Sequence, residues 1–322
     1  MDRQAVAFCF VYNDIGQGEF TVTKTDTLNY EKVYFTLWET AQRYSSFCQF
    51  RVIGNSHDDR MIPMLELGSG QDAVFCLAGL DGTDAVAPQL LVNMAREYCQ
   101  AYECGWQLDN FYEVRKLLDR VRICLIPLLN PDGYEICRGG FTVIRNPIYR
   151  QMLRMQSIPY QEFAYNARGM DIRQNFPTAY YTRQWAGQEP ASENETKALI
   201  RIFQEYKSCG LLSFTRNGKK IIYYRNSQGY SSNQKTYRLA RHLQKRSDYH
   251  LEKYQPQEAQ ERGKRCVMGT PEQFYMQIVK QPAFLIETPG QSGEQEDMEK
   301  IWKKAYEEIY LLPLEYIFSI EE

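Results

Sequence analysis

The residues that could do chemistry in this chain are mostly acidic, because imidazole is scarce. Only three histidines, His57, His242 and His250, occur among the 322 residues. Catalytic zinc sites usually draw on histidine nitrogen, so such a site must use these three or do without them. Carboxylates are plentiful, with 40 Asp and Glu, and they suit hard cations or act as general bases. The histidine count therefore sets a narrow limit on any metal site built from clustered histidines.

Short β-branched runs alternate with amphipathic helical stretches along most of the chain. Helices are predicted over 28–46, 84–102, 193–206 and 235–244, and strands over 50–53, 62–67, 73–77, 121–129, 211–214, 221–224 and 283–287. This alternation predicts a single α/β domain with a mixed, mostly parallel twisted sheet and helices on both faces. The pattern of residues 1–27 predicts a hairpin that precedes a domain of residues 28–322. Ser192-x-x-Glu195 predicts a capping box at the start of the helix over 193–206.

Ligands of an open α/β sheet bind where strands hand over to the following segment at their carboxyl ends. Four segments stand at such positions: AGLDGTD (78–84), LLNPDG (128–133), SFTRNG (213–218) and IETPG (286–290). All four could line one crevice, which would bring together Asp81, Asp84, Thr215 and Glu287. The stretch 135–168 is long and irregular in pattern, and either a lid over this crevice or a surface excursion fits it.

Several motifs resemble one family. They are RVIGNSHDDRMIPMLELG (51–68), IPLLNPDGYE (126–135), NARGMDIRQNFP (166–177), SENET (192–196) and FLIETPG (284–290). In this order and spacing the chain resembles the carboxypeptidase A-like zinc metallopeptidases, in particular the bacterial members that trim cell-wall peptides. The resemblance runs from about residue 28 to the C-terminus, and it implies the zinc-carboxypeptidase fold.

The resemblance also implies a position for zinc, at which this chain differs from the family pattern. Where family members have an H-x-x-E pair and a third, histidine ligand, this sequence has Asp81, Asp84 and Thr215. Two short carboxylates and a hydroxyl are a poor zinc set, so we expect no metal ligands and no cofactor here. The three histidines lie outside these motif positions, and we expect them to be surface or helix-side residues.

The substrate positions implied by the resemblance differ as well. Family members hold the substrate carboxylate with an Asn-Arg pair, where this chain has Arg173 and Gln174. On an extended segment that shift would turn the positive charge to the opposite face. Ala164 stands where a residue that polarises the scissile carbonyl is expected. Glu287 matches the general base, and a strand-end role paired to Arg173 or Lys219 is an equal alternative.

Three functions fit these residues. The first is an inactive pseudopeptidase that keeps a cleft able to take a peptide or peptide-like ligand. The second is an active hydrolase in which Asp81, Asp84 and Glu287 hold Zn²⁺ or another divalent cation such as Mg²⁺, Mn²⁺ or Ca²⁺. The third is a binding module for a peptide or glycan fragment, in which Arg173, Arg216 and Lys219 hold an acidic ligand such as a peptide carboxylate.

Composition excludes other classes. A net charge of -2 gives no basic field for nucleic acid, and no long uncharged apolar run predicts a membrane span. Nine cysteines without a C-x-x-C pair are typical of reduced thiols, so we expect a cytoplasmic protein. The sequence leaves the oligomeric state open.

Overall fold

The structure is a computed structural model that describes residues 28–179, 181, 183, 188–216, 218–224, 229–254, 269–289 and 298–321. The predicted hairpin of residues 1–27 lies outside the described residues. Among the helices that are described, none has both the length and the apolar character needed to cross a bilayer.

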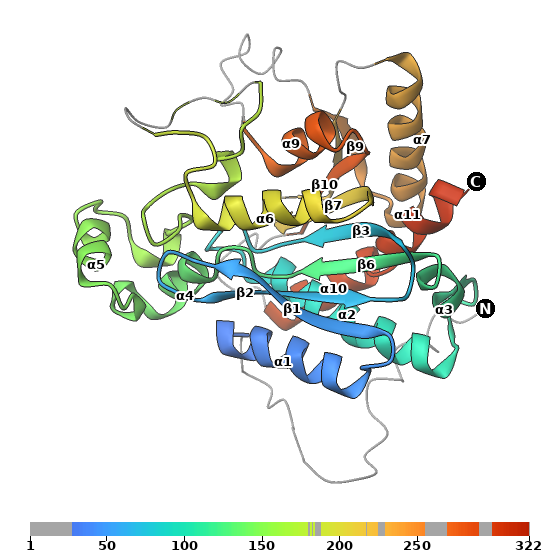
Figure 1. Ribbon diagram of the computed structural model, residues 1–322, viewed down its shortest axis with the longest axis horizontal. Helices are drawn as coiled ribbons and strands as arrows, with labels where there is room; N and C mark the ends of the chain where they lie inside the picture. The colour runs from blue at the N-terminus through green and yellow to red at the C-terminus, as the bar shows by residue number, and fades with distance from the viewer. Residues whose placement is uncertain are drawn as a thin grey trace.

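A mixed sheet of eight strands forms the centre of the molecule (Figure 1). Its spatial order is β1-β2-β6-β3-β7-β10-β8-β9. The strands are β1 (Cys48–Asn55), β2 (Met61–Leu67), β3 (Asp72–Leu77), β6 (Val121–Ile126), β7 (Ser208–Arg216), β8 (Lys220–Tyr223), β9 (His250–Lys253) and β10 (Ala283–Thr288). The central strands β6, β3, β7 and β10 are parallel, whereas β1, β2 and β8 pair antiparallel with their neighbours toward the centre. The predicted fold class is confirmed.

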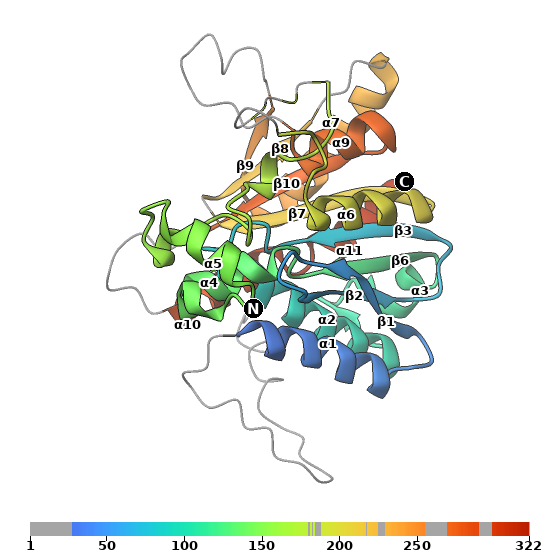
Figure 2. The same cartoon turned by 60° about the vertical axis from the view of Figure 1, so that its left-hand side comes forward.

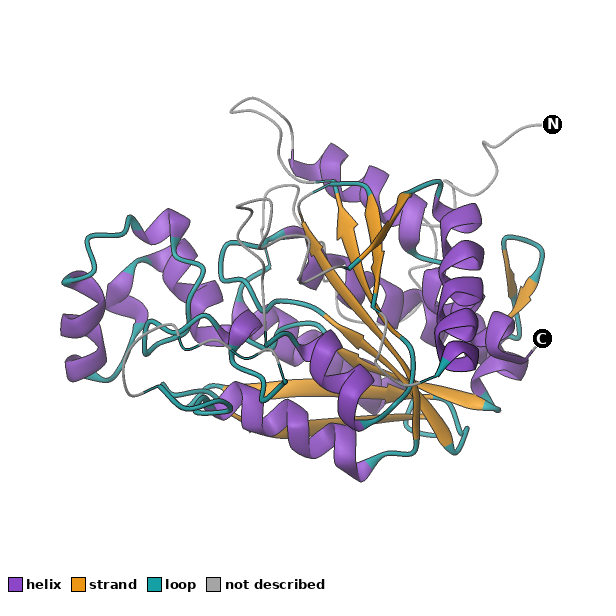
Figure 3. Ribbon diagram, turned by 90° about the horizontal axis from the view of Figure 1, so that it is seen from above, coloured by secondary structure: helices purple, strands orange, loops and turns teal. Residues whose placement is uncertain are grey.

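Helices cover both faces of this sheet (Figures 1 and 2). One face carries α1 (Tyr30–Arg43), α2 (Val86–Cys104), α3 (Val114–Leu118), α7 (Tyr230–Ser247), α10 (Met298–Ile309) and α11 (Leu312–Glu321). The other face carries α6 (Asn194–Glu205) and α9 (Pro271–Ile278). A separate two-stranded ribbon, β4 (Gln107–Leu108) and β5 (Tyr112–Glu113), precedes α3, and Figure 3 shows it apart from the main sheet.

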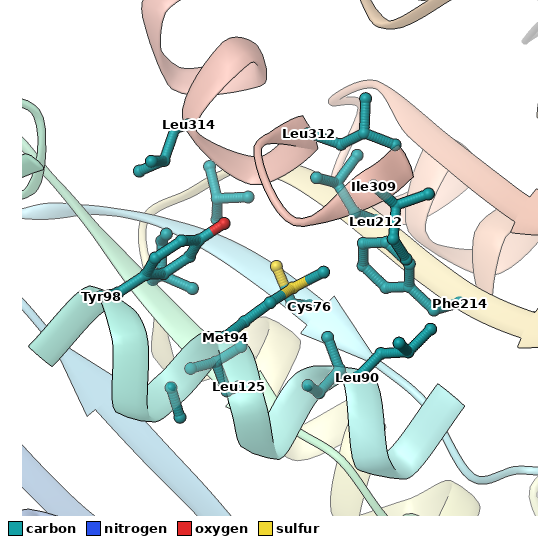
Figure 4. Packing of buried hydrophobic residues seen from close by; sticks show 14 of the residues in the cluster. Cys76, Leu90, Met94, Tyr98, Leu125, Leu212, Phe214, Ile309, Leu312 and Leu314 are labelled. Carbon is teal, nitrogen blue, oxygen red and sulfur yellow. The ribbon is translucent and has the colours of Figure 1, made fainter. Parts of the chain in front are cut away.

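The larger core lies between the sheet and α2 (Figure 4). Leu90, Met94 and Tyr98 repeat every four residues, so they share one helix face, and all are buried. They face Cys76 of β3 and Leu125 of β6, which are also fully buried. This packing fixes the start of α2, and with it the loop that leads out of β3.

The stretch after β6 is more regular than its sequence suggests. It holds α4 (Pro131–Gly139), α5 (Pro147–Arg154) and two 3-10 turns, Phe141–Val143 and Tyr160–Glu162. Its apolar side chains form a small core of their own: Ile136, Ile144, Leu153, Phe163 and Ala167. The segment is therefore a packed excursion beside the sheet rather than an irregular loop.

Candidate functional site

The loop between β3 and α2 presents Asp81. Its Oδ1 accepts hydrogen bonds from the backbone amide and the hydroxyl of Thr83, at 2.9 and 2.7 Å. Its Oδ2 accepts a hydrogen bond from Nη1 of Arg173 at 2.6 Å. The side chain is 16% exposed, so this ion pair is partly shielded from water. Asp81 thus uses both carboxylate oxygens on partners within the protein.

Arg173 reaches Asp81 because its backbone is turned rather than extended. It lies in the 3-10 turn Ile172–Gln174, for which Asp171 is the N-cap. Its Nε and Nη2 donate to the two carboxylate oxygens of Asp171 at 2.8 and 2.9 Å, and Gln174 donates to the same carboxylate at 2.8 Å. Burial alone would lower the pKa of Arg173, but the bond and the charge of Asp171 and the charge of Asp81 raise it. The expectation that this charge turns to the opposite face is wrong.

Asp84 is almost fully buried, at 1% exposure, and is bonded only to backbone amides among the described residues. Oδ1 accepts from the amides of Val86 and Ala87, the first residues of α2, at 2.9 and 3.0 Å. Oδ2 accepts from the amide of Arg216 at the end of β7, at 3.2 Å. Burial raises the pKa of Asp84, while these amides and the charge of Arg216 oppose the rise. Asp84 therefore ties the start of α2 to the end of β7.

Thr215 and Glu287 lie beside each other as paired residues of β7 and β10. On its other side Glu287 is paired with Lys220 of β8. Burial raises the pKa of Glu287, and the positive charge of Lys220 opposes that rise. Neither of the partners expected for Glu287 is its partner here, because Arg173 pairs with Asp81 and Asp171 and Lys219 pairs with Glu308.

The candidate site is thus assembled at the carboxyl ends of β3, β7 and β10. Hydrogen bonds connect Asp81 to Arg173, and Asp84 to the end of β7. A bond from Arg216 Nη2 to Thr83 Oγ1, at 2.8 Å, closes the same loop. Glu287 joins this group only through strand pairing. The half-buried carboxylate of Glu287 can accept a proton. The guanidinium of Arg173, held by Asp81 and Asp171, can donate to a polar ligand.

The sequence reasoning missed a second polar cluster, around His57, Glu193 and Glu195. His57 follows β1, and its side chain is only 11% exposed, so the expectation of a surface residue is wrong. The predicted capping box is also wrong, since α6 begins at Asn194 and its N-cap, Glu193, makes no side-chain capping bond. Glu195 turns inward instead and is fully buried. The sequence offered little to indicate this cluster: two glutamates at the start of a predicted helix and a histidine in a turn far away in the chain.

An α/β protein with a mixed eight-stranded sheet and a polar site at its carboxyl edge is the class that this geometry defines. The family model of the zinc carboxypeptidases, peptidase family M14, matches residues 33–307. The chain belongs to that zinc carboxypeptidase family.

Curated relatives match part of the chain. The chain is 27% identical over 194 residues to the uncharacterized protein YqgT of Bacillus subtilis, covering 55% of this chain and 50% of that protein. It is 22% identical over 201 residues to gamma-D-glutamyl-L-diamino acid endopeptidase 1 of Lysinibacillus sphaericus, covering 55% and 48%. The chain thus spans about half the length of these curated relatives.

The fold likeness extends further than the sequence likeness. The crystal structure of thrombin activatable fibrinolysis inhibitor aligns with a TM-score of 0.70 at 13% identity, over 92% of this chain and 78% of that one. Carboxypeptidase A from Helicoverpa armigera aligns with a TM-score of 0.66 at 16% identity, over 92% and 75%.

Zinc is the metal that this family implies, and the residues at the positions matched in the sequence can be tested for their fit to it. A catalytic zinc site offers three protein ligands with free lone pairs aimed at one point. Asp81 already shares its carboxylate with a guanidinium, and Asp84 directs both oxygens at backbone amides. Thr215 offers only a neutral hydroxyl. These three residues, so arranged, do not fit a zinc ion.

Proposed function

We propose that this zinc-carboxypeptidase-family protein is catalytically inactive as a peptidase and uses its cleft to bind a peptide or peptide-like ligand. The observation that carries the proposal is the Arg173 guanidinium, which donates to Asp81 at 2.6 Å. A cation held there would lie within a few ångströms of a fixed positive charge. At 4 Å, even with an effective dielectric of 20, two unit charges interact by about 4 kcal/mol.

The chemistry left to Glu287 supports the same proposal. As a general base it can take a proton only from water that is acidic enough to give it up. Without a metal, water keeps a pKa of about 15.7, against about 7 on a catalytic zinc ion. One half-buried carboxylate does not supply the missing stabilisation of the hydroxide, so Glu287 alone is not expected to sustain peptide hydrolysis.

The carboxyl edge of the sheet keeps groups suited to a polar ligand. Arg173 is 35% exposed at its side chain although it holds two aspartates, and Arg216, at the end of β7, donates to Thr83 on the loop that carries Asp81. Charge-assisted hydrogen bonds from guanidinium groups are the usual way to hold a peptide carboxylate. The relative from Lysinibacillus sphaericus is named for gamma-D-glutamyl-diamino acid bonds, and peptides of that type are the first ligands to try.

The alternative is an active hydrolase in which Asp81, Asp84 and Glu287 hold a divalent cation. It requires Arg173 to leave Asp81 and the start of α2 to release Asp84. Either change leaves a buried or half-buried charge without its present partners. The contacts of the described residues therefore do not favour this arrangement.

The test is a hydrolysis assay with N-acylated dipeptides and with gamma-D-glutamyl-diaminopimelate peptides, in chelator and with added Zn²⁺ or Mn²⁺. We expect no turnover above that of Glu287→Gln, and binding of at least one of these peptides by calorimetry, weakened in Arg173→Ala. Metal-dependent turnover that Glu287→Gln abolishes would instead establish the alternative. Absence of both turnover and binding would refute the proposed binding role.

A further inference from the structure

The cluster around His57 lies apart from the residues described above and joins two distant parts of the chain. His57 comes from the turn after β1, and Glu193 and Glu195 come from the start of α6. One nitrogen or oxygen atom of each lies within 4.8 Å of the others. Both glutamates are fully buried, and the His57 side chain is 11% exposed, which leaves one side open to solvent.

The contacts of His57 place its Nε2 between a carboxylate oxygen and a backbone N–H. Its Nε2 lies 3.0 Å from Oε2 of Glu193 and also faces the backbone N–H of Asn194 at 3.3 Å. A lone pair on Nε2 repels the carboxylate oxygen, whereas a proton on Nε2 opposes the N–H of Asn194. A proton or a metal ion between Nε2 and the carboxylate removes the repulsion between these two acceptors, and either one takes the lone pair to which Asn194 donates.

Glu195 supplies the second, independent sign. Its Oε1 is buried and has no hydrogen-bond partner among the described residues. Its Oε2 and Oε2 of Glu193 both accept from Nδ2 of Asn166, at 3.3 and 2.7 Å. The orientation of this amide is fixed, because Oδ1 of Asn166 accepts from the amides of Arg168 and Met170. A buried acceptor left unpaired is destabilising, so a ligand there would be stabilising.

The charges nearby do not balance without a further cation. Arg60 forms ion pairs with Asp58 and Asp132, each at 2.8 Å. The negative charge of Asp132 also disfavours the charged form of Glu195. Among the described residues, Arg168 is the one guanidinium paired with Glu193, at 3.2 Å from Oε1 and not from the oxygen that faces His57. Buried carboxylates in excess of their cations require protons or a metal ion.

We propose that His57, Glu193 and Glu195 bind one divalent transition-metal ion of the Zn²⁺ type, at a site separate from the position that the family motif assigns to zinc. One imidazole and two carboxylates form a suitable donor set, with water in the remaining position. Two ligands of one tetrahedral zinc ion lie about 3.4 Å apart. Nε2 of His57 and Oε2 of Glu193 are 3.0 Å apart, and the ligand atoms of all three residues lie within 4.8 Å of one another. Asn166 and Arg168 would orient the carboxylates from outside, as such groups do in metal sites.

The bound ion would clamp the turn after β1 to the first turn of α6. The site would therefore act on the structure rather than on a peptide bond, and the proposal stands whether or not the Asp81 cleft binds a ligand.

The experiment measures Zn²⁺ binding to the whole chain after chelator treatment, by calorimetry and by metal analysis after dialysis. We expect one equivalent in the wild type. His57→Ala and Glu195→Gln are expected to weaken binding by about tenfold or more, since removing even a group that only orients a ligand costs about 10- to 100-fold. Asp81→Asn is the matched control, an acidic residue of the other site, and it should bind as the wild type does.

Each outcome decides the matter. One equivalent that is lost in His57→Ala and Glu195→Gln but kept in Asp81→Asn supports the site. Zinc lost in Asp81→Asn and kept in the other two variants places the metal in the cleft and overturns the proposal. Failure of the wild type to bind Zn²⁺ also overturns it, because protons then neutralise the cluster. Glu195→Gln keeps size and an acceptor for Asn166, so it serves if His57→Ala does not fold.

Discussion

Replacing Glu195 by Gln should remove a large part of the pH dependence of stability above pH 5. Burial and the negative charge of Asp132 raise the pKa of Glu195 to about 8, against 4.5 for an ordinary glutamate. The folded protein therefore holds a proton that the unfolded chain releases, so the free energy of unfolding falls as pH rises from about 4.5 to 8. At about 1.4 kcal/mol for each unit of pKa, the loss between pH 5 and pH 8 is about 3 kcal/mol.

Glutamine does not titrate, and its amide oxygen still accepts from Asn166. The variant should match the wild type at pH 5, where the Glu195 carboxyl is protonated, and exceed it by about 3 kcal/mol at pH 8. Urea unfolding in the presence of chelator, at several pH values in this range, measures the difference. Glu31→Gln, a substitution at an exposed residue of α1, is the control and should leave the pH profile unchanged. A difference between Glu195→Gln and the wild type that stays constant from pH 5 to 8 would refute the reasoning.

Two further substitutions test the contacts that hold the framework and the cleft. Arg60→Ala leaves Asp132 buried and without its cation, so it should destabilise the fold by about 3–5 kcal/mol in urea unfolding. Lys116→Ala is the control, because Lys116 belongs to an exposed ion pair, and it should cost less than about 1 kcal/mol. Arg173→Ala deprives the nearly buried Asp171 of its two-bond partner and should cost about 1–3 kcal/mol by the same measurement; an unchanged stability would mean that this ion pair does not form in solution.

The predicted sheet and its principal helices depended on local pattern, and the structure contains them. The run 121–129 predicted a strand because it is continuously apolar and β-branched, and β6 is buried between neighbours as such runs usually are. The predicted helix 84–102 corresponds to α2, whose buried residues repeat with helical spacing. Patterns of this kind report which face of an element is buried, and that is a local property of the sequence.

Side-chain partners were predicted less well, because they depend on where the chain turns. The direction of Arg173 was inferred from an extended backbone, whereas Asp171 caps a 3-10 turn and redirects the side chain toward Asp81. The burial of His57 depends on Glu193, which is distant in sequence and meets it only when α6 packs against β1. No periodicity relates two such residues, so the second cluster was beyond the reach of a single sequence.

The contacts explain how this fold can persist with unusual residues at the positions assigned to zinc. Asp84 finds its partners at the start of α2 and the end of β7, and Asp81 finds its partners in Thr83 and Arg173, so neither carboxylate needs a metal ion to be satisfied. The stability of this end of the sheet rests more on Arg60 and the buried acids it holds, where a missing cation costs several kcal/mol. Because Arg60 and the acids it holds are not among the three positions assigned to zinc, substitutions at those three positions can change the chemistry while this support of the fold is retained.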